Sequence, residues 1–167
     1  GATYMAAEYG GEAIDALSVE QRFTISNMAI EMGAKCGLME ADEKTVNWVK
    51  AHSQKEFATV KADDDAIYAR VKEYDVSTLE PQVAKPHTVD NVSPVSQVAG
   101  TPIQQGVIGT CTNGRIEDLR IAAGILKGRK IDRHTRLIVA PASRQVMLQA
   151  IREGLLEIFV EAGAAVV

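Results

Sequence analysis

The chain has 167 residues, of which 46% are hydrophobic and 24% are charged, and its net charge is -4. These proportions are ordinary for a soluble globular protein, and the length is enough to bury a sizeable core in one domain or two small lobes. No apolar run approaches the roughly 20 residues that cross a bilayer, and the acidic balance argues against nucleic-acid binding. Two distant cysteines give no disulfide framework. We therefore expect a cytoplasmic protein without membrane or nucleic-acid partners.

A capped helix is the clearest element near the amino end. Ser18, followed by Gln21 three residues on, predicts a helix that starts with a capping box and ends near Gly33. Asn27 and Glu31 stand four apart on this helix and therefore share a face. From spacing alone, that face is typical of the solvated side of an amphipathic helix.

The rest of the first lobe, which we expect to end at residue 83, has weaker signals. Residues 36–39 are a short strand candidate, and Asp42 is a candidate cap for the next helix. Alternation of apolar and polar residues over 67–72 predicts a half-buried strand. Residues 84–101 are rich in turn formers and are expected to connect this lobe to the next.

The second lobe, residues 102–167, alternates strand and helix patterns in the way a parallel sheet does. Strands are predicted over 106–109, 137–140 and 164–167, and helices over 115–127 and 143–152. Right-handed crossovers would bring Cys111 and the turn at 141–143 to the carboxyl edge of the sheet, where open parallel sheets bind ligands. We expect an α/β fold with a three-layer αβα arrangement and a mainly parallel sheet.

Cys111 occupies the most informative position in the chain. An apolar run stops at this cysteine, and helical spacing starts at Ile116, so the thiol lies at a strand-to-helix turn. Free N–H groups and the positive end of a helix dipole favour the thiolate, which is the form that binds metal. From these residues alone, a buried and inert cysteine is an equally good interpretation.

Four ordered blocks of sequence resemble the aconitase superfamily and, within it, the large-subunit family of the 3-isopropylmalate dehydratases (isopropylmalate isomerases). The blocks are TISNMAIEMGA at 24–34, LEPQVAKPH at 79–87 with Asp90 and Asn91, VIGTCTNGRIEDLR at 107–120, and APAS at 140–143. Their order and spacing, over nearly the whole chain, make the resemblance specific. It implies the large-subunit fold of that superfamily, with residues 1–83 and 102–167 as two of its lobes.

The resemblance also implies a function. In the family, the cysteine that matches Cys111 is a ligand of a 4Fe-4S cluster. The motif Asn-Met-x-x-Glu, which matches Asn27 and Glu31, lies beside the cluster, and its glutamate orients an active-site histidine supplied by an earlier segment. The implied reaction is hydro-lyase isomerisation of 2- and 3-isopropylmalate by dehydration and rehydration, in leucine biosynthesis. The implied partners are a small subunit and a hydroxy-acid substrate.

A 4Fe-4S cluster takes several thiolates, and one cysteine cannot be expected to hold it. In the family, a Cys-x-x-Cys pair follows shortly after a segment that resembles residues 161–167. We therefore expect that this chain is an internal piece of a longer large subunit and is inactive by itself. A Cys-x-x-Cys pair should follow within about fifteen residues of Val167 in the longer protein.

Three alternatives stay open on the sequence. The substrate could be another tricarboxylic or 2-hydroxy acid, as in aconitase or homoaconitase, and the isolated chain could serve as a non-catalytic binding or assembly module. Arg115 could hold a substrate carboxylate or pair with Glu117 or Asp118. A cysteine phosphatase is disfavoured, because a phosphate-cradling loop needs about five residues between its cysteine and arginine and this chain has three.

Overall fold

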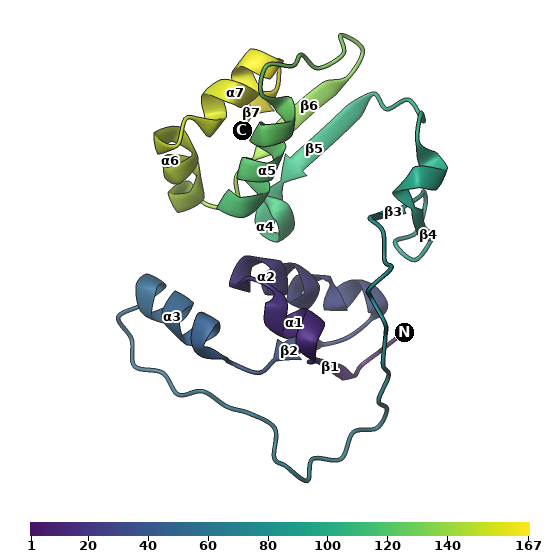
Figure 1. Ribbon diagram of the computed structural model, residues 1–167, viewed down its shortest axis with the longest axis vertical. Coiled ribbons are helices and arrows are strands. Elements are labelled where there is room, and N and C mark those ends of the chain that lie inside the picture. Colours follow the sequence, from purple (N-terminus) through teal and green to yellow (C-terminus); the bar gives the residue numbers. More distant parts are fainter. The chain divides into compact units, whose positions relative to one another are not determined.

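Parallel strand pairing organises both halves of the chain. The computed structural model describes residues 1–167, which divide into two compact units, Gly1–Ala99 and Gly100–Val167. Each unit combines helices with parallel strands (Figure 1), so the predicted α/β class with mainly parallel pairing is confirmed. None of the helices is both long enough and apolar enough to cross a membrane.

Unit 1 is built on one pair of parallel strands. Strand β1 (Ala6–Tyr9) pairs with β2 (Cys36–Met39) in a register that runs from Ala6 opposite Cys36 to Tyr9 opposite Met39. The connection contains α1 (Glu12–Ala16), α2 (Val19–Met28) and the 3-10 helix η1 (Ala29–Met32), and α3 (Glu43–His52) follows β2. The strand predicted at 36–39 is confirmed.

Helix α2 begins as the sequence predicts, whereas the predicted end near Gly33 is reached through a 3-10 helix after α2 stops at Met28. The hydroxyl of Ser18 accepts a hydrogen bond from the Gln21 backbone N–H at 3.2 Å, and the Gln21 side chain accepts one from the Ser18 N–H at 2.9 Å. This reciprocal pair is a capping box. At the other end the chain tightens into η1 and stops at Gly33, whose φ of +86° is a left-handed conformation that glycine adopts without steric cost.

Helix α2 approaches β2 closely because residue 37 is glycine. A Cβ at Gly37 would lie 3.0 Å from both Ala29 Cβ and Ser26 Cα, a distance that would push the helix away. The Ser26 hydroxyl donates a hydrogen bond to the Gly37 carbonyl at 2.7 Å. Ala29 is almost fully buried at this contact, so unit 1 buries little more than small side chains between its helix and its sheet.

A buried arginine joins the helices of unit 1. Arg22 is 6% exposed, and its Nη2 lies 2.6 Å from Asp42 Oδ2 and 3.2 Å from the Asp15 carbonyl oxygen. Asp42 also caps α3 as predicted, since its Oδ1 accepts the Thr45 backbone N–H at 2.9 Å. The hydrogen bond from the Arg22 guanidinium, followed by those from Thr45, holds the pKa of Asp42 well below its usual range.

The segment between α3 and the end of unit 1 differs from the sequence-based expectation. The half-buried strand predicted at 67–72 is wrong, because these residues pair with no strand and Ile67 is 98% exposed. Alternation alone cannot create a strand where no partner ladder exists. β3 (Gln82–Ala84) and β4 (Val92–Pro94) form a short antiparallel pair that spans the start of the expected connecting segment, and the 3-10 helix η2 (Val95–Val98) follows.

Unit 2 is a three-stranded parallel sheet in the order β5-β6-β7. The strands are β5 (Gln105–Gly109), β6 (Arg136–Ala140) and β7 (Ala165–Val166). The helices are α4 (Thr110–Asn113), α5 (Ile116–Leu126), α6 (Arg144–Arg152) and α7 (Leu155–Ala162). All three predicted strands and both predicted helices are confirmed, whereas α4 and α7 were not predicted.

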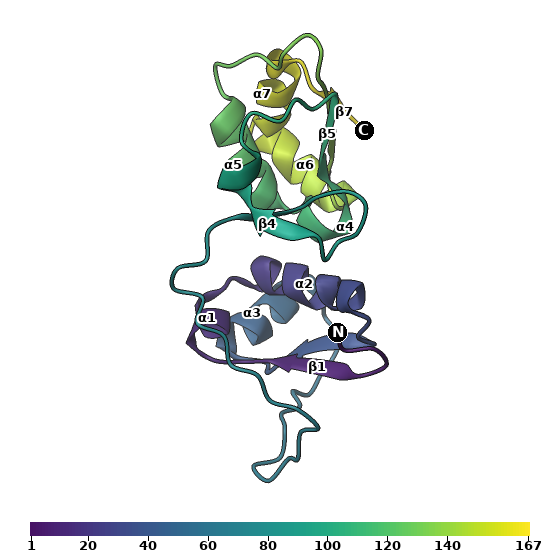
Figure 2. The ribbon, with the colours of Figure 1, turned by 90° about the vertical axis from the view of Figure 1, so that its right-hand side faces the viewer.

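The core of unit 2 lies between the sheet and three helices. Leu119, Val139 and Phe159 are fully buried there, and Ile108 and Leu137 pack against them from the sheet. Figure 2 shows α5, α6 and α7 on one side of β5. Because side chains alternate along a strand, the residues between the core positions point to the opposite face of the sheet. Since α5, α6 and α7 all cover the first face, unit 2 has two layers, a sheet and one layer of helices, and the second helical layer of the expected αβα arrangement stays a prediction.

The Arg22–Asp42 contact gives a test of the packing in unit 1. Asparagine caps helices as well as aspartate does, so Asp42→Asn keeps the cap of α3 and removes the counterion of a buried guanidinium. We expect a loss of about 1 kcal/mol in the free energy of unfolding, because the carboxylate is partly exposed to solvent and its charge is screened. Urea denaturation at pH 7 measures this loss.

The same carboxylate predicts a pH dependence. Because folding lowers the pKa of Asp42, its contribution is complete above its ordinary pKa of 3.8 and is lost as the pH falls below that value. The difference between the wild type and Asp42→Asn should therefore shrink in acid. Asp64→Asn is the matched control, since Asp64 is fully exposed and lies 3.9 Å from Lys61; equal effects of the two substitutions would contradict the assignment.

Candidate functional site

Cys111 lies in a distorted turn at the carboxyl end of β5. The strand ends at Gly109, whose φ is +140°, and the next residue, Thr110, has a φ of +69°. A positive φ is unusual for a β-branched residue and marks a strained backbone. The chain then makes the single helical turn α4, and Cys111 at its second position is exposed. The alternative of a buried, inert cysteine is wrong for the described chain.

Two glycines fix this turn against the neighbouring strand. A Cβ at Gly109 would lie 2.0 Å from the Ala140 carbonyl oxygen, and one at Gly114 would lie 2.6 Å from the same atom. The Gly114 carbonyl in turn accepts the Ala142 backbone N–H at 2.8 Å. The cysteine turn and the turn after β6 therefore lie together at the carboxyl edge of the sheet, as the sequence predicts.

Polar side chains close the turn at its helical end. Asp118 accepts the Arg115 backbone N–H at 3.0 Å and the Asn113 side-chain amide at 3.2 Å, which caps the start of α5. The guanidinium of Arg115 donates to the Cys111 carbonyl at 3.3 Å. Arg115 thus has a role that was not among the two expected ones, substrate binding and pairing with Glu117 or Asp118: it holds the backbone of the cysteine turn.

The start of α6 and the end of β7 lie at the same carboxyl edge of the sheet. Ser143 caps α6, since its hydroxyl accepts the Val146 N–H at 3.2 Å. Strand β7 pairs with β6, and the Val167 backbone N–H donates to the Val139 carbonyl at 3.0 Å. Val167 therefore lies at the carboxyl edge of the sheet, as Cys111 does, but on the other side of β6.

The described residues supply one candidate cluster ligand and not a set. No group of three or more histidine, cysteine or acidic side chains is arranged to hold a metal ion. The second thiol, Cys36, lies in β2 of unit 1, and neither cysteine is in a disulfide. An exposed thiol on a fixed turn fits a single thiolate ligand, whereas a 4Fe-4S cluster needs others from elsewhere.

Asn27 and Glu31 lie at the carboxyl end of the first capped helix. Asn27 is in the last turn of α2 and Glu31 is in η1, and both are exposed. Since a 3-10 helix has about three residues per turn, their side chains are offset further around the axis than in a continuous α-helix. Neither this change of helix type nor the approach of Gly109 and Gly114 to Ala140 was predicted from the sequence. The glycines on both sides of Cys111 indicate a close backbone approach but not the strand that makes it.

The glycine contacts predict a sharp sensitivity to added methyl groups. Gly109→Ala and Gly114→Ala should each destabilise unit 2 by about 3 kcal/mol or more, because the new Cβ would overlap the Ala140 carbonyl. Gly124→Ala in α5 is the matched control: its Cβ meets nothing within 4 Å, and alanine favours a helix by up to about 1 kcal/mol. Thermal unfolding of the three variants compares them, and a tolerated Gly109→Ala would show that the turn is not fixed in this way.

Comparisons with known proteins identify the family. The model of the aconitase family (aconitate hydratase) matches residues 1–102 and 96–167. Among similar proteins, the probable 3-isopropylmalate dehydratase large subunit of Methanothermobacter thermautotrophicus is 57% identical, and the 3-isopropylmalate dehydratase large subunit of Halothermothrix orenii is 54% identical. Large subunit 1 of the dehydratase of Pyrococcus furiosus is 53% identical. Each match covers 99% of this chain and 40% of the relative, so the chain spans about two fifths of their length. The chain belongs to the aconitase family.

Proposed function

We propose that this chain is part of the large subunit of a 3-isopropylmalate dehydratase, a cytoplasmic hydro-lyase of leucine biosynthesis. The reaction is the interconversion of 2- and 3-isopropylmalate by loss and readdition of water. The observation that carries the proposal is the sequence identity of 50–57% with dehydratase large subunits along nearly the whole chain. The exposed cysteine at the carboxyl edge of a parallel sheet supports it, because such edges bind ligands.

In this proposal Cys111 is one of the thiolate ligands of a 4Fe-4S cluster. A bound cluster of this kind supplies a Lewis acid for the hydroxyl and carboxylate oxygens of the substrate. The contribution of this chain is to hold the sulfur at a fixed place: the contacts of Gly109 and Gly114 with Ala140 and the bond from Arg115 all restrain the backbone around it. The other thiolates come from outside the described chain, so the chain alone is inactive.

Asn27 and Glu31 have supporting roles in the complete enzyme. We propose that Asn27 hydrogen-bonds beside the cluster and that Glu31 fixes the tautomer and orientation of a histidine supplied by another segment. Their exposure supports these roles, since both side chains are accessible to groups beyond unit 1. The small subunit completes the enzyme, and the substrate is a hydroxy acid.

Replacement of Cys111 tests the cluster assignment. In the complete large subunit assembled with its small subunit, Cys111→Ser should abolish cluster retention and dehydratase activity. The fold should be unchanged, because the exposed sulfur fills no part of the core. Iron and sulfide content, visible absorption and circular dichroism give the three readouts. Cys36→Ser is the control and should keep its iron; normal iron content in Cys111→Ser would refute the assignment.

Replacement of Glu31 tests the positioning role. Glu31→Gln in the assembled enzyme should lower kcat by about 10- to 100-fold and leave iron content unchanged, because partners that orient a catalytic or ligand histidine have effects of this size. The pH profile of kcat should shift as well, since the histidine loses the carboxylate that stabilises its charged form. The control is Glu56→Gln, at an exposed position outside the Asn-Met-x-x-Glu motif. An unchanged pH profile in Glu31→Gln would contradict the role.

A further inference from the structure

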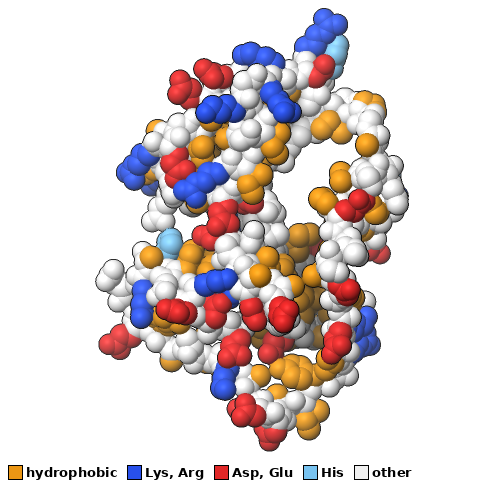
Figure 3. Space-filling model, in the orientation of Figure 1, with side chains coloured by type: hydrophobic (Ala, Val, Ile, Leu, Met, Phe, Trp, Pro, Cys, Tyr) orange, Lys and Arg blue, Asp and Glu red, His pale blue; other side chains and the backbone are white.

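Positive charge is concentrated in one loop of unit 2. Residues 100–167 carry nine lysines and arginines against six acidic residues, whereas residues 1–99 carry nine against sixteen. Five of the nine cations of unit 2 lie in the loop between α5 and β6 or at the first residue of β6. These five residues form what we call the basic edge: Lys127, Arg129, Lys130, Arg133 and Arg136. Lysine and arginine side chains stand out at the top of Figure 3, where Figure 1 shows this loop.

The cations of the basic edge have no acidic partner. All five side chains are exposed, and none of them takes part in an ion pair. Asp132 is the one acidic residue in the loop, and its groups serve the turn: its carboxylate accepts the His134 backbone N–H at 2.8 Å, and its carbonyl accepts the Thr135 N–H at 2.9 Å. The loop therefore keeps an excess of positive charge, which attracts anionic groups.

The backbone of this loop is fixed to the rest of unit 2. The Ile131 N–H donates to the Ala162 carbonyl at 2.9 Å, at the end of α7. The hydroxyl of Thr135 donates to the Ile103 carbonyl at 2.9 Å, just before β5. Because the backbone that carries the cations is already ordered, a partner that binds there loses little conformational entropy in the loop.

Arg133 has the geometry to bind a carboxylate. Its Nε donates to His134 Nε2 at 3.0 Å, which restrains the side chain, and its two terminal amino groups make no hydrogen bond. These two groups can donate side by side to the two oxygens of one carboxylate. Arg133 therefore offers a two-pronged carboxylate site within a cluster of further cations.

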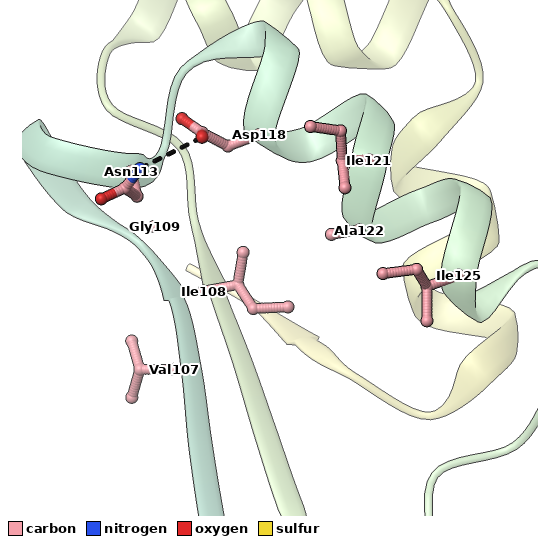
Figure 4. A pocket seen from close by; sticks show the side chains of 8 residues that line it. All are labelled: Val107, Ile108, Gly109, Asn113, Asp118, Ile121, Ala122 and Ile125. Carbon is pink, nitrogen blue, oxygen red and sulfur yellow. Dashed lines mark hydrogen bonds between the residues drawn. The ribbon is translucent and has the colours of Figure 1, made fainter. Parts of the chain in front are cut away.

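The basic edge lies at the end of the sheet opposite the cysteine turn. It precedes β6, whereas Cys111 follows β5, whose five residues separate the two ends by roughly 16 Å. At the end that carries Cys111, the hollow between β5 and α5 is lined by apolar side chains and by Asn113 and Asp118, and no cation lines it (Figure 4). A partner at the basic edge would therefore leave the cysteine turn uncovered.

The composition of the loop favours protein carboxylates over other polyanions. Residues 127–136 contain no Phe, Tyr or Trp, and the one such residue of unit 2, Phe159, is fully buried. Proteins that bind single-stranded nucleic acid stack its bases on accessible aromatic rings. The net charge of -4 opposes the attraction of a long polyanion such as duplex DNA. Ile131, the apolar residue of the loop, is half-buried and cannot insert into a lipid surface.

We propose that the basic edge binds an acidic segment of a partner protein, rich in aspartate and glutamate. Clusters of arginine are a common means of recognising acidic segments. Contacts between exposed charges are weak and are screened by salt, so this association is transient and loses affinity as the salt concentration rises. The inference does not depend on the proposed function, since it uses no residue of the cysteine turn.

Peptide binding to the complete protein that contains this chain tests the proposal. The probe is a fluorescein-labelled peptide of alternating glutamate and glycine, measured by fluorescence anisotropy at about 50 mM salt. The triple variant Arg129→Gln, Arg133→Gln, Arg136→Gln should bind it about tenfold more weakly, because each exposed ion pair strengthens binding by a factor of about 1.5 to 5. Circular dichroism should show an unchanged fold, since the three side chains are exposed.

A second triple variant is the matched control. Lys55→Gln, Arg70→Gln, Lys72→Gln removes the same charge from exposed positions of unit 1 and should bind the peptide as the wild type does. The same peptide with glutamine in place of glutamate should not bind to any of the proteins.

Four results would overturn the inference. The wild type could fail to bind the acidic peptide, or the two triple variants could lose equal affinity, which would show an effect of net charge alone. Tighter binding of an RNA oligonucleotide or of phosphatidylserine vesicles, lost in the first variant, would assign the basic edge to nucleic acid or lipid. A wild type without dehydratase activity that still binds the peptide at the basic edge would refute the proposed function and leave this inference standing.

Discussion

The contact of two glycines with the carbonyl of Ala140 determines the geometry around Cys111. Neither Gly109 nor Gly114 can carry a side chain there, because the nearest atoms are backbone atoms of Ala140 and, for Gly114, also of Thr110, which cannot move aside as a flexible side chain can. The consequence is that the stretch from Gly109 to Gly114 is held at both ends to the same point of the sheet. In the role proposed for Cys111, such restraint would fix the position of the sulfur before a metal binds. The left-handed conformation of Thr110 is the local strain that accompanies this arrangement.

Much of unit 2 could be predicted because its signals are local. The apolar runs that became β5 and β6 are short and bounded by turn residues, and Ser143 caps α6 as its position suggests. Helix α7 was missed because Leu155–Ala162 begins directly after Gly154, where α6 has just ended, and the apolar residues there have no capping residue before them. The packing of Gly109 against Ala140 could not be predicted, because it depends on the register of two strands far apart in sequence.

Unit 1 shows the limits of pattern analysis more clearly. The caps at Ser18 and Asp42 were recognisable because each depends on residues three positions away. The strand predicted at 67–72 failed because its alternation has no partner, and the hydroxyl of Tyr68 instead donates to Glu8 at 2.8 Å. Figure 3 shows hydrophobic side chains at the surface, and Met28 and Ile30, next to Asn27 and Glu31, are among the exposed ones. Exposed apolar residues around polar ones are typical of surfaces that are covered in a larger protein.

The order β5-β6-β7 follows the order of the chain, and this has a consequence for synthesis on the ribosome. Each strand of unit 2 pairs with the one made just before it, so the sheet can grow outward as the polypeptide emerges, and each step closes one helix-containing crossover, over residues 110–135 and then 141–164. Its first strand keeps an open side throughout that growth. In a nascent chain the apolar flank of β5 is therefore exposed while the later strands are made, and this is the interval in which a chaperone that binds apolar surface would act.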